Sequence, residues 1–344
     1  MPVSVFSTPA VTEAGKAMAL AVVLAMAASY LPLVSLPLMT LMPLPLAFLV
    51  LRRGAAVGIA AAFGTGVLTL LLTLPVGGIA NGVLALGLAG VVGVALGLAL
   101  RRQWEFSLTL LVGSLAAAVS LAASSAAIWV LTGLSRARLE STFDQSLDGV
   151  KQMYAAMGMT QANLDLMSEQ ARAILRVMPY LLPSMFAVSG LLLVTVSLAL
   201  AGSIFPRAGQ AIPASLSFAR FRVHWSLAYG LIGGLALVVL ARAFGPAREA
   251  ALLVGANLLI VFGTLYFLEG LALVHWFSVS RRLSGGSRLL LYGGALIAQF
   301  LLWVLSWVGL LDTWFDYRKR FAPREDSPSP PPTGREDRGD PEEW

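Results

Sequence analysis

Residues 79–100 read IANGVLALGLAGVVGVALGLAL and contain no charged side chain. An α-helix needs about 20 apolar residues to cross the hydrocarbon core of a bilayer, and it must pair its own backbone groups because lipid cannot. This run therefore predicts a membrane-spanning helix. It also decides the fold class, since comparable runs recur along most of the chain.

The composition supports the same interpretation for the whole chain. Hydrophobic residues make up 58% of the 344 residues and charged residues 12%, and the mean hydropathy is +0.80. Soluble domains carry about 25% charged residues. The chain has no cysteine, which excludes disulfides, thiol catalysis and cysteine-ligated metals.

About nine runs are long and apolar enough to be considered as spans. They are Ala17–Leu33, Leu36–Leu51, Ala55–Leu74, Ile79–Leu100, Phe106–Leu134, Val177–Ile204, Trp225–Ala243, Ala251–Phe277 and Leu289–Leu311. The second contains Pro37, Pro43 and Pro45, which remove backbone donors, so it is expected to be kinked or partly re-entrant. Glycine-rich stretches in the third and fourth predict close helix packing. We predict an all-α polytopic transmembrane helix bundle of about eight or nine spans, forming one domain over residues 1–321.

Arginines and lysines near the span ends predict the orientation. Four groups fall in alternate loops, which places the N-terminus in the cytoplasm: Arg52–Arg53, Arg101–Arg102, Arg207 with Arg220 and Arg222, and Arg281 with Arg282 and Arg288. Nine spans would send the C-terminus outside, yet Arg318–Arg320 follows the last run and favours the cytoplasm. Either one run does not cross or the C-terminal segment breaks the rule. Residues 322–344 are rich in proline and charge and are predicted to be a disordered tail.

Residues 135–176 differ from the spans. Apolar residues recur there at intervals of three and four, and Gly158 separates two such stretches. We predict an amphipathic helical hairpin outside the membrane. Its acidic and basic residues balance, whereas lipid-binding helices are usually cationic. The hairpin is therefore expected to pack on protein, either its own spans or a partner.

Glu269 is the one ionisable residue well within a predicted span, and Tyr266 lies one turn before it. An ionisable group inside a membrane is a functional hypothesis by default because its burial is costly. Glu269 and Tyr266 are therefore candidates for binding a substrate or ion. The alternative is a structural carboxylate paired with an arginine.

Other polar and small residues within the spans have similar alternatives. Asn257 and Gln299 are further candidates for a substrate or ion, although such side chains commonly join helices by hydrogen bonds. Ala17, Ala21 and Ala25 form a small-residue stripe on the first run, which permits close approach of another helix. That helix is either one of this chain or one of a partner.

Residues 309–320 read GLLDTWFDYRKR and close the last run. Aromatic residues and charges at a span end are typical of an interface anchor, here Asp312, Trp314, Phe315, Asp316 and Arg318. Asp316 is expected to pair with Arg320 one turn later. The two carboxylates could instead bind a cation.

Catalytic and nucleotide-binding motifs are absent from the sequence. There are two histidines, so a histidine-based metal site is not expected. We predict that the protein is not an enzyme, requires no cofactor or metal, and binds no nucleic acid.

The closing motif resembles that of the YybS-like family of uncharacterised bacterial membrane proteins. Residues 42–46 (MPLPL), 51–54 (LRRG) and 266–270 (YFLEG) are similar to that family in place and order. The resemblance implies a bacterial inner membrane location but no established activity. The first six spans also resemble the S components of energy-coupling-factor transporters. That likeness implies that Ala17, Ala21 and Ala25 dock another membrane subunit.

Two functions are consistent with these features. The first is a transport-related protein that binds a small solute or ion within the helix bundle. The second is a non-transporting membrane scaffold that recruits partners. A cavity beside Glu269 would favour the first, and a sealed contact with an arginine would count against it.

Overall fold

A computed structural model describes residues 7–131, 133, 135–213 and 216–321. The described residues form α-helices and short 3-10 or π turns, and no strand occurs among them. The prediction of an all-α polytopic bundle is confirmed. Eight helical segments in the described part of the chain are long and apolar enough to cross a membrane.

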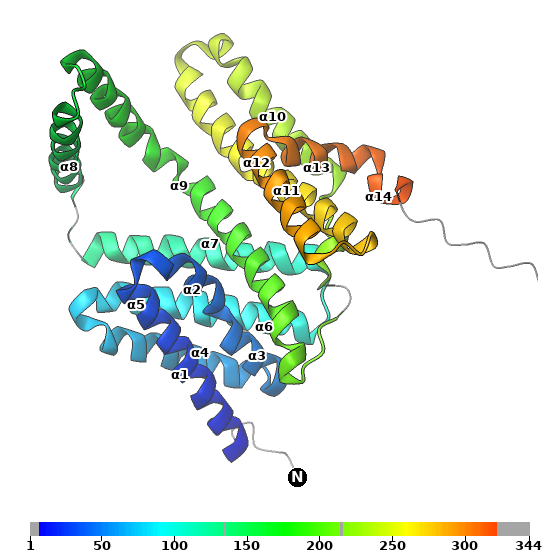
Figure 1. The fold of residues 1–344 in the computed structure, drawn as a ribbon. Coiled ribbons are helices and arrows are strands. Elements are labelled where there is room, and N and C mark those ends of the chain that lie inside the picture. Colours follow the sequence, from blue (N-terminus) through cyan, green and yellow to red (C-terminus); the bar gives the residue numbers. More distant parts are fainter. Residues whose placement is uncertain (1–6, 132, 134, 214–215, 322–344) are drawn as a thin grey trace, which may run out of the picture.

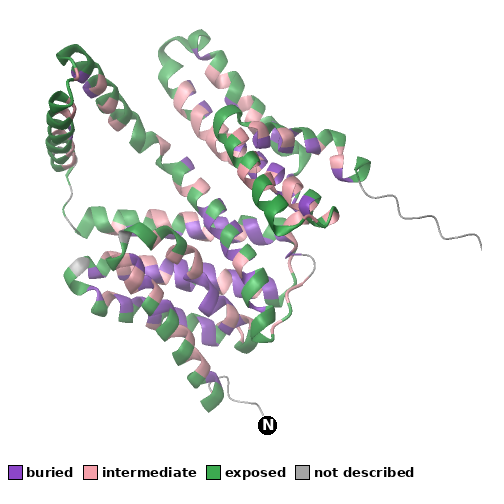
Figure 2. Ribbon diagram, in the orientation of Figure 1, coloured by how far each residue is buried: buried purple, intermediate pink, exposed green. Residues whose placement is uncertain are grey.

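The N-terminal body contains the helices before the hairpin (Figure 1). These are α1 (Thr8–Tyr30), α2 (Ser35–Leu41), α3 (Pro43–Arg53), α4 (Ala55–Leu72), α5 (Gly78–Ala85), the π-helix η3 (Leu86–Val92), α6 (Gly93–Arg101) and α7 (Phe106–Leu131), with the 3-10 turns η1 (Pro32–Val34) and η2 (Leu74–Val76). Buried residues concentrate where α3 to α7 pack together (Figure 2).

The hairpin and the C-terminal body follow. They contain α8 (Arg136–Ala156), α9 (Gln161–Ile204), α10 (Ala228–Val239), α11 (Arg248–Ser280), α12 (Gly285–Leu302), α13 (Val304–Phe315) and α14 (Tyr317–Arg320). Short 3-10 turns join them: η4 (Pro206–Ala208), η6 (Phe218–Arg220), η7 (Trp225–Leu227) and η8 (Ala241–Ala247). α10 to α14 gather beside the N-terminal body, and α9 runs obliquely between the two (Figure 1).

The glycine-rich runs pack closely, as predicted. A Cβ on Gly93 would lie 2.7 Å from the carbonyl oxygen of Pro43, and one on Gly97 would lie 2.7 Å from that of Ala47. α6 therefore approaches the backbone of α3 at a distance that a larger residue would prevent.

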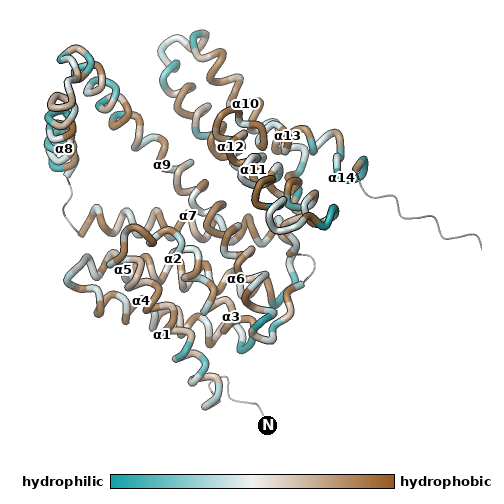
Figure 3. Tube along the Cα trace, viewed as in Figure 1, coloured by the Kyte–Doolittle hydropathy of each residue, from teal (hydrophilic) through white to brown (hydrophobic). Residues whose placement is uncertain are grey.

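α9 is one helix, although the sequence patterns predict two segments there: the second half of the hairpin, which ends at residue 176, and the span Val177–Ile204. It is 44 residues long and includes Pro179 and Pro183, which corresponds to about 66 Å at 1.5 Å per residue. That is about twice the thickness of a hydrocarbon core. Its first half packs against α8, where Leu147 and Leu164 are buried and Arg172 donates to Asp144, and Gly158 lies between the two helices at φ +89°. The hairpin carries both hydrophilic and hydrophobic residues and stands away from the α1–α7 body (Figures 1 and 3).

Two predicted spans are interrupted. The proline-containing second run is divided into α2 and α3 at Met42, which itself keeps helical dihedral angles. The last run was expected to be a continuous helix, which is wrong: Trp303 adopts a left-handed conformation (φ 55°) that divides α12 from α13. α13 has 12 residues, about 18 Å, and is too short to cross a bilayer alone.

The break at Trp303 also brings the residues after α13 against an earlier connecting segment of the chain. After Trp303, α13 crosses α11, and α14 lies against residues 219–222. The cationic Arg318–Arg320 segment and residues 219–222, which carry Arg220 and Arg222, therefore lie next to one another. Among the described residues, the eight candidate spans retain the last run as Gly285–Leu302 and leave out the predicted run Trp225–Ala243, whose apolar helix Trp225–Val239 is shorter than 18 residues.

Candidate functional site

A candidate site lies between the N-terminal and C-terminal bodies. It is a cavity of about 730 Å³. α7, α9, α11, α13 and the segment 221–227 form its walls, and the residues that line it include Leu110, Leu111, Ser114, Leu115, Leu191, Phe221, Arg222, Val223, His224, Val261, Leu265, Glu269, Asp312 and Thr313. The cavity is apolar over α7 and α9, and its charged residues come from α11, α13 and the adjoining segment. Its size falls within the range of small-molecule sites.

Glu269 lies at the charged end of this cavity. The residue is 1% exposed, and the backbone N–H of Val223 hydrogen bonds to its carboxyl group. Its Oε2 atom has no hydrogen-bond partner, and neither does the buried hydroxyl of Tyr266 one turn earlier. Glu269 forms no ion pair within the described ranges, so the sealed arginine contact considered above is not observed.

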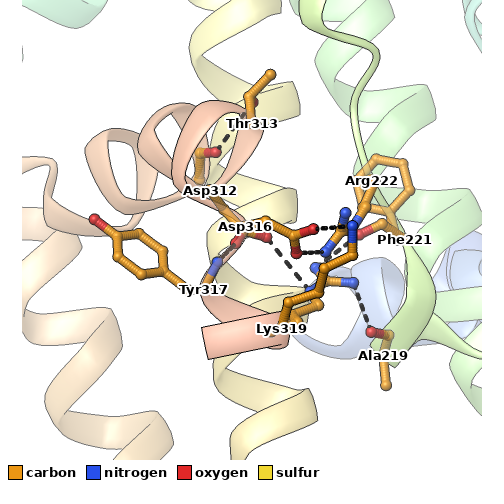
Figure 4. Close-up of polar contacts among 10 residues, drawn as sticks. Ala219, Phe221, Arg222, Asp312, Thr313, Asp316, Tyr317 and Lys319 are labelled. Carbon is orange, nitrogen blue, oxygen red and sulfur yellow. Dashed lines mark hydrogen bonds and ion pairs between the residues drawn. The ribbon is translucent and has the colours of Figure 1, made fainter. Parts of the chain in front are cut away.

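Arg222 and Asp312, which line the cavity, belong to a charged cluster of side chains (Figure 4). Arg318 is 8% exposed and donates to the carbonyl oxygens of Ala219 (2.7 Å) and Phe221 (2.8 Å). Its Nε lies 3.4 Å from Oδ2 of Asp312, while the Tyr317 N–H donates to Oδ1 of Asp312. We call Arg222, Asp312, Asp316 and Arg318 the C-terminal clasp, because they join α13 and α14 to the segment 219–222.

Asp316 pairs with residues other than the predicted one. It accepts a hydrogen bond from Arg222 and lies 3.0 Å from Lys319. The expected partner was Arg320, which is wrong because Asp316 is left-handed (φ 45°) and ends α13. The hydrogen bond from Arg222 holds the pKa of the Asp316 carboxyl well below its usual range. The contribution of this ion pair to stability is therefore fully present at neutral pH. It is lost as the pH falls below the ordinary pKa of aspartate.

The predicted interface anchor divides into two parts. Asp312 and Arg318 are buried in the clasp, whereas Trp314 and Phe315 are largely exposed. Exposed aromatic side chains at the end of an apolar helix suit the headgroup layer of a bilayer. The motif therefore combines an outward aromatic face with an inward polar one.

Asn257 lies away from the cavity and connects α11 to α9. Its Nδ2 donates to the carbonyl oxygen of Tyr180 (2.9 Å), and its Oδ1 accepts from the N–H of Ser184 (3.2 Å). These groups flank Pro183, which has no N–H and weakens the helix at that turn. Asn257 thus supports the proline-containing turn, the interhelical role that was the alternative to ligand binding.

Replacing Asn257 with leucine is expected to lower stability by about 1 kcal/mol, because two hydrogen bonds between helices are lost in an apolar setting. Thermal unfolding of the purified protein in detergent measures the change. Thr264→Val is the matched control, since Thr264 bonds only within its own helix, to the carbonyl of Ile260. An equal effect of both substitutions would contradict the role assigned to Asn257.

Gln299, like Asn257, forms hydrogen bonds that support an irregular part of the fold, here the break between α12 and α13. Its amide donates to Oγ of Ser306 (3.0 Å) and accepts from the N–H of Ser306 (3.1 Å). Ser306 in turn donates to the carbonyl oxygen of Gly263 on α11. Gln299 does not line the cavity and instead fastens the two halves of the broken run.

The alanine stripe of α1 faces the interior of the chain. Ala21 and Ala25 are buried, Ala17 is partly exposed, and α1 packs against α3 and α4. The close approach that these residues permit is used within the chain. Docking of another subunit on the same stripe would require α1 to leave α4.

The segment 218–224 was not recognised as part of a site from the sequence. It reads FARFRVH and alternates apolar with polar residues. Phe221 and Val223 are buried, and Phe106 of α7 packs against Phe218 and Phe221. This alternation was the available signal, because it indicates an extended segment with one face buried.

No cluster of three or more histidine, aspartate and glutamate side chains that could hold a metal ion occurs among the residues described. No curated protein and no solved structure matches the chain. A family described as predicted membrane protein, DUF2232, matches residues 19–313. That match extends from α1 into α13, and the chain belongs to the DUF2232 family of predicted membrane proteins.

Proposed function

We propose that this protein binds a small solute or ion in the cavity between its two bodies, as part of a transport-related function without enzymatic activity. One observation carries the proposal. The buried carboxyl group of Glu269 has an unpartnered oxygen at the end of a cavity of about 730 Å³. Buried polar atoms are nearly always paired, so an unpaired one beside a cavity indicates a place for a ligand.

The charges around the cavity favour a cationic group on the ligand. Arg222 is engaged by Asp316, and Arg318 by Asp312 and two carbonyl oxygens. Glu269 is left as the carboxyl group without a cationic partner. A small molecule with an apolar body and one ammonium group matches the leucine-lined walls at one end and Glu269 at the other. A proton or an inorganic cation carries the same positive charge as the ammonium group and would be a smaller ligand for Glu269.

Binding of 2-phenylethylamine, measured by equilibrium dialysis with the detergent-purified protein, tests this proposal. Glu269→Gln keeps the shape of the side chain and removes its charge. We expect the affinity for the amine to fall by about tenfold or more. Glu249→Gln is the matched control, because Glu249 lies exposed in the first turn of the same helix. No binding by the wild type, or equal binding by wild type and Glu269→Gln, would contradict the proposal.

The resemblance to S components favours transport but adds no substrate, and the resemblance to YybS-like proteins implies no activity. A non-transporting scaffold is the second candidate, and the projecting α8–α9 hairpin favours it (Figure 1). Affinity purification in mild detergent separates the two, since the scaffold requires stable protein partners. Deletion of residues 135–160 would remove such partners and leave amine binding unaffected.

A further inference from the structure

A second cavity lies on the N-terminal body, away from Glu269. It has a volume of about 540 Å³ and lies between α1, the last residue of α2, α3 and the end of α9. Its walls are mainly apolar: Leu20, Leu24, Leu41, Leu44, Phe48, Leu49, Ile204 and Phe205. Phe48 and Phe205 meet edge to face at 5.2 Å and hold α3 against the end of α9. The groove is thus formed by four helices and is lined mainly by apolar side chains.

The mouth of this groove is positively charged. Arg53 donates to both oxygens of Glu13, each at 2.7 Å, and these two groups neutralise one another. Arg52 makes a longer contact of 3.6 Å with the same carboxylate and remains 42% exposed. Lys16 is exposed and forms no ion pair within the described part of the chain. Two cations therefore face the groove beyond the neutral pair.

Arg52 is also oriented by the groove. Its guanidinium group lies 5.7 Å from the centre of the Phe48 ring, within the range of a cation–π contact. Phe48 is one of the groove walls, so the cation is held where the apolar lining ends. An occupant with a hydrocarbon chain and an anionic group at one end would meet complementary surfaces along its length.

We propose that this groove binds an anionic phospholipid, with an acyl chain along α1 and α3 and the phosphate between Lys16 and Arg52. Basic pockets between transmembrane helices recognise anionic headgroups in this way. Free phosphate would leave the apolar walls exposed, and a zwitterionic lipid would bring its own cation close to Arg52. The site is separate from the cavity at Glu269 and does not depend on the function proposed for it.

Native mass spectrometry of the full-length protein, with phosphatidylglycerol or phosphatidylcholine added to the detergent, tests the site. We expect preferential retention of phosphatidylglycerol, and a loss of about fivefold in its affinity for each charge removed by Lys16→Gln and Arg52→Gln. Arg281→Gln is the matched control. Arg281 also ends a helix and lies 5.7 Å from a phenylalanine ring, but it does not line the groove.

If a variant that combines Lys16→Gln with Arg52→Gln does not fold, Lys16→Gln alone still tests the site, because Lys16 is exposed and its replacement does not disturb the packed interior. Equal affinity of the wild type for the two lipids would overturn the proposal, since the charges would then play no part. Undiminished phosphatidylglycerol binding by the folded variants would overturn it as well. An equal loss in Arg281→Gln would show a general effect of surface charge and would also count against the site.

Discussion

Replacing Arg318 with methionine is expected to destabilise the protein by about 3–5 kcal/mol, because it leaves a buried carboxylate without its counter-ion. Asp312 is 2% exposed and lies 3.4 Å from the guanidinium group. The substitution also removes the donors to the carbonyl oxygens of Ala219 and Phe221. Methionine matches the length of the arginine stem, so lost packing contributes little. Thermal and denaturant unfolding in detergent measure the loss.

Lys319→Met is the control for this prediction. Lys319 neighbours Arg318 but is 84% exposed, and it pairs only with Asp316. Exposed ion pairs contribute about 0–1 kcal/mol. A double variant, Asp312→Asn with Arg318→Met, is expected to recover part of the loss because no unpaired charge remains. Equal destabilisation by the two single methionine substitutions would refute the importance of the clasp.

Gly309→Ala is expected to detach α13 from α11 and to lower stability by about 2–3 kcal/mol. A Cβ on Gly309 would lie 2.0 Å from the carbonyl oxygen of Tyr266 and 2.8 Å from the backbone nitrogen of Gly270. Both obstacles are backbone atoms of α11, which cannot move aside as a flexible side chain can. The helices must therefore separate, and Asp312 moves with α13.

The absence of native cysteine makes this displacement measurable. Thr313 lines the cavity, so the rate at which maleimide labels Thr313→Cys reports how well α13 closes it. We expect faster labelling in the Gly309→Ala background. Gly294→Ala on α12 is the control, since a Cβ there meets nothing within 4 Å. Unchanged labelling and stability in Gly309→Ala would show that the contact with α11 is not required.

The candidate site illustrates how far polar residues can be interpreted from sequence. Glu269 was identified because an ionisable residue within an apolar run is unusual. Asn257 and Gln299 satisfied the same criterion, but their amides support a proline-containing turn and a helix break. Only the neighbours of each group distinguish these roles. Arg222 was assigned to topology alone, because its contact with Asp316 joins residues 94 positions apart.

The last apolar run shows a related limit. Its hydropathy is continuous, so it predicts one helix from Leu289 to Leu311. The chain instead turns at Trp303, where Gln299 bonds to Ser306 and Gly309 meets Gly270. The break is stabilised by contacts with α11, and hydropathy along one segment contains no information about them. Tertiary packing here outweighs the local tendency to continue the helix.

The sequence by itself determined that this protein is an all-α membrane protein, which segments are apolar enough to span, and that Glu269 is an unusual residue. These conclusions depend on composition and periodicity, because the cost of exposing polar groups to lipid acts on each segment separately. The tertiary structure alone decided that α9 continues through the hairpin, that the last run folds back over α11, and that Glu269 borders a cavity. Those features depend on contacts between distant residues, whose energies arise only when the helices are assembled.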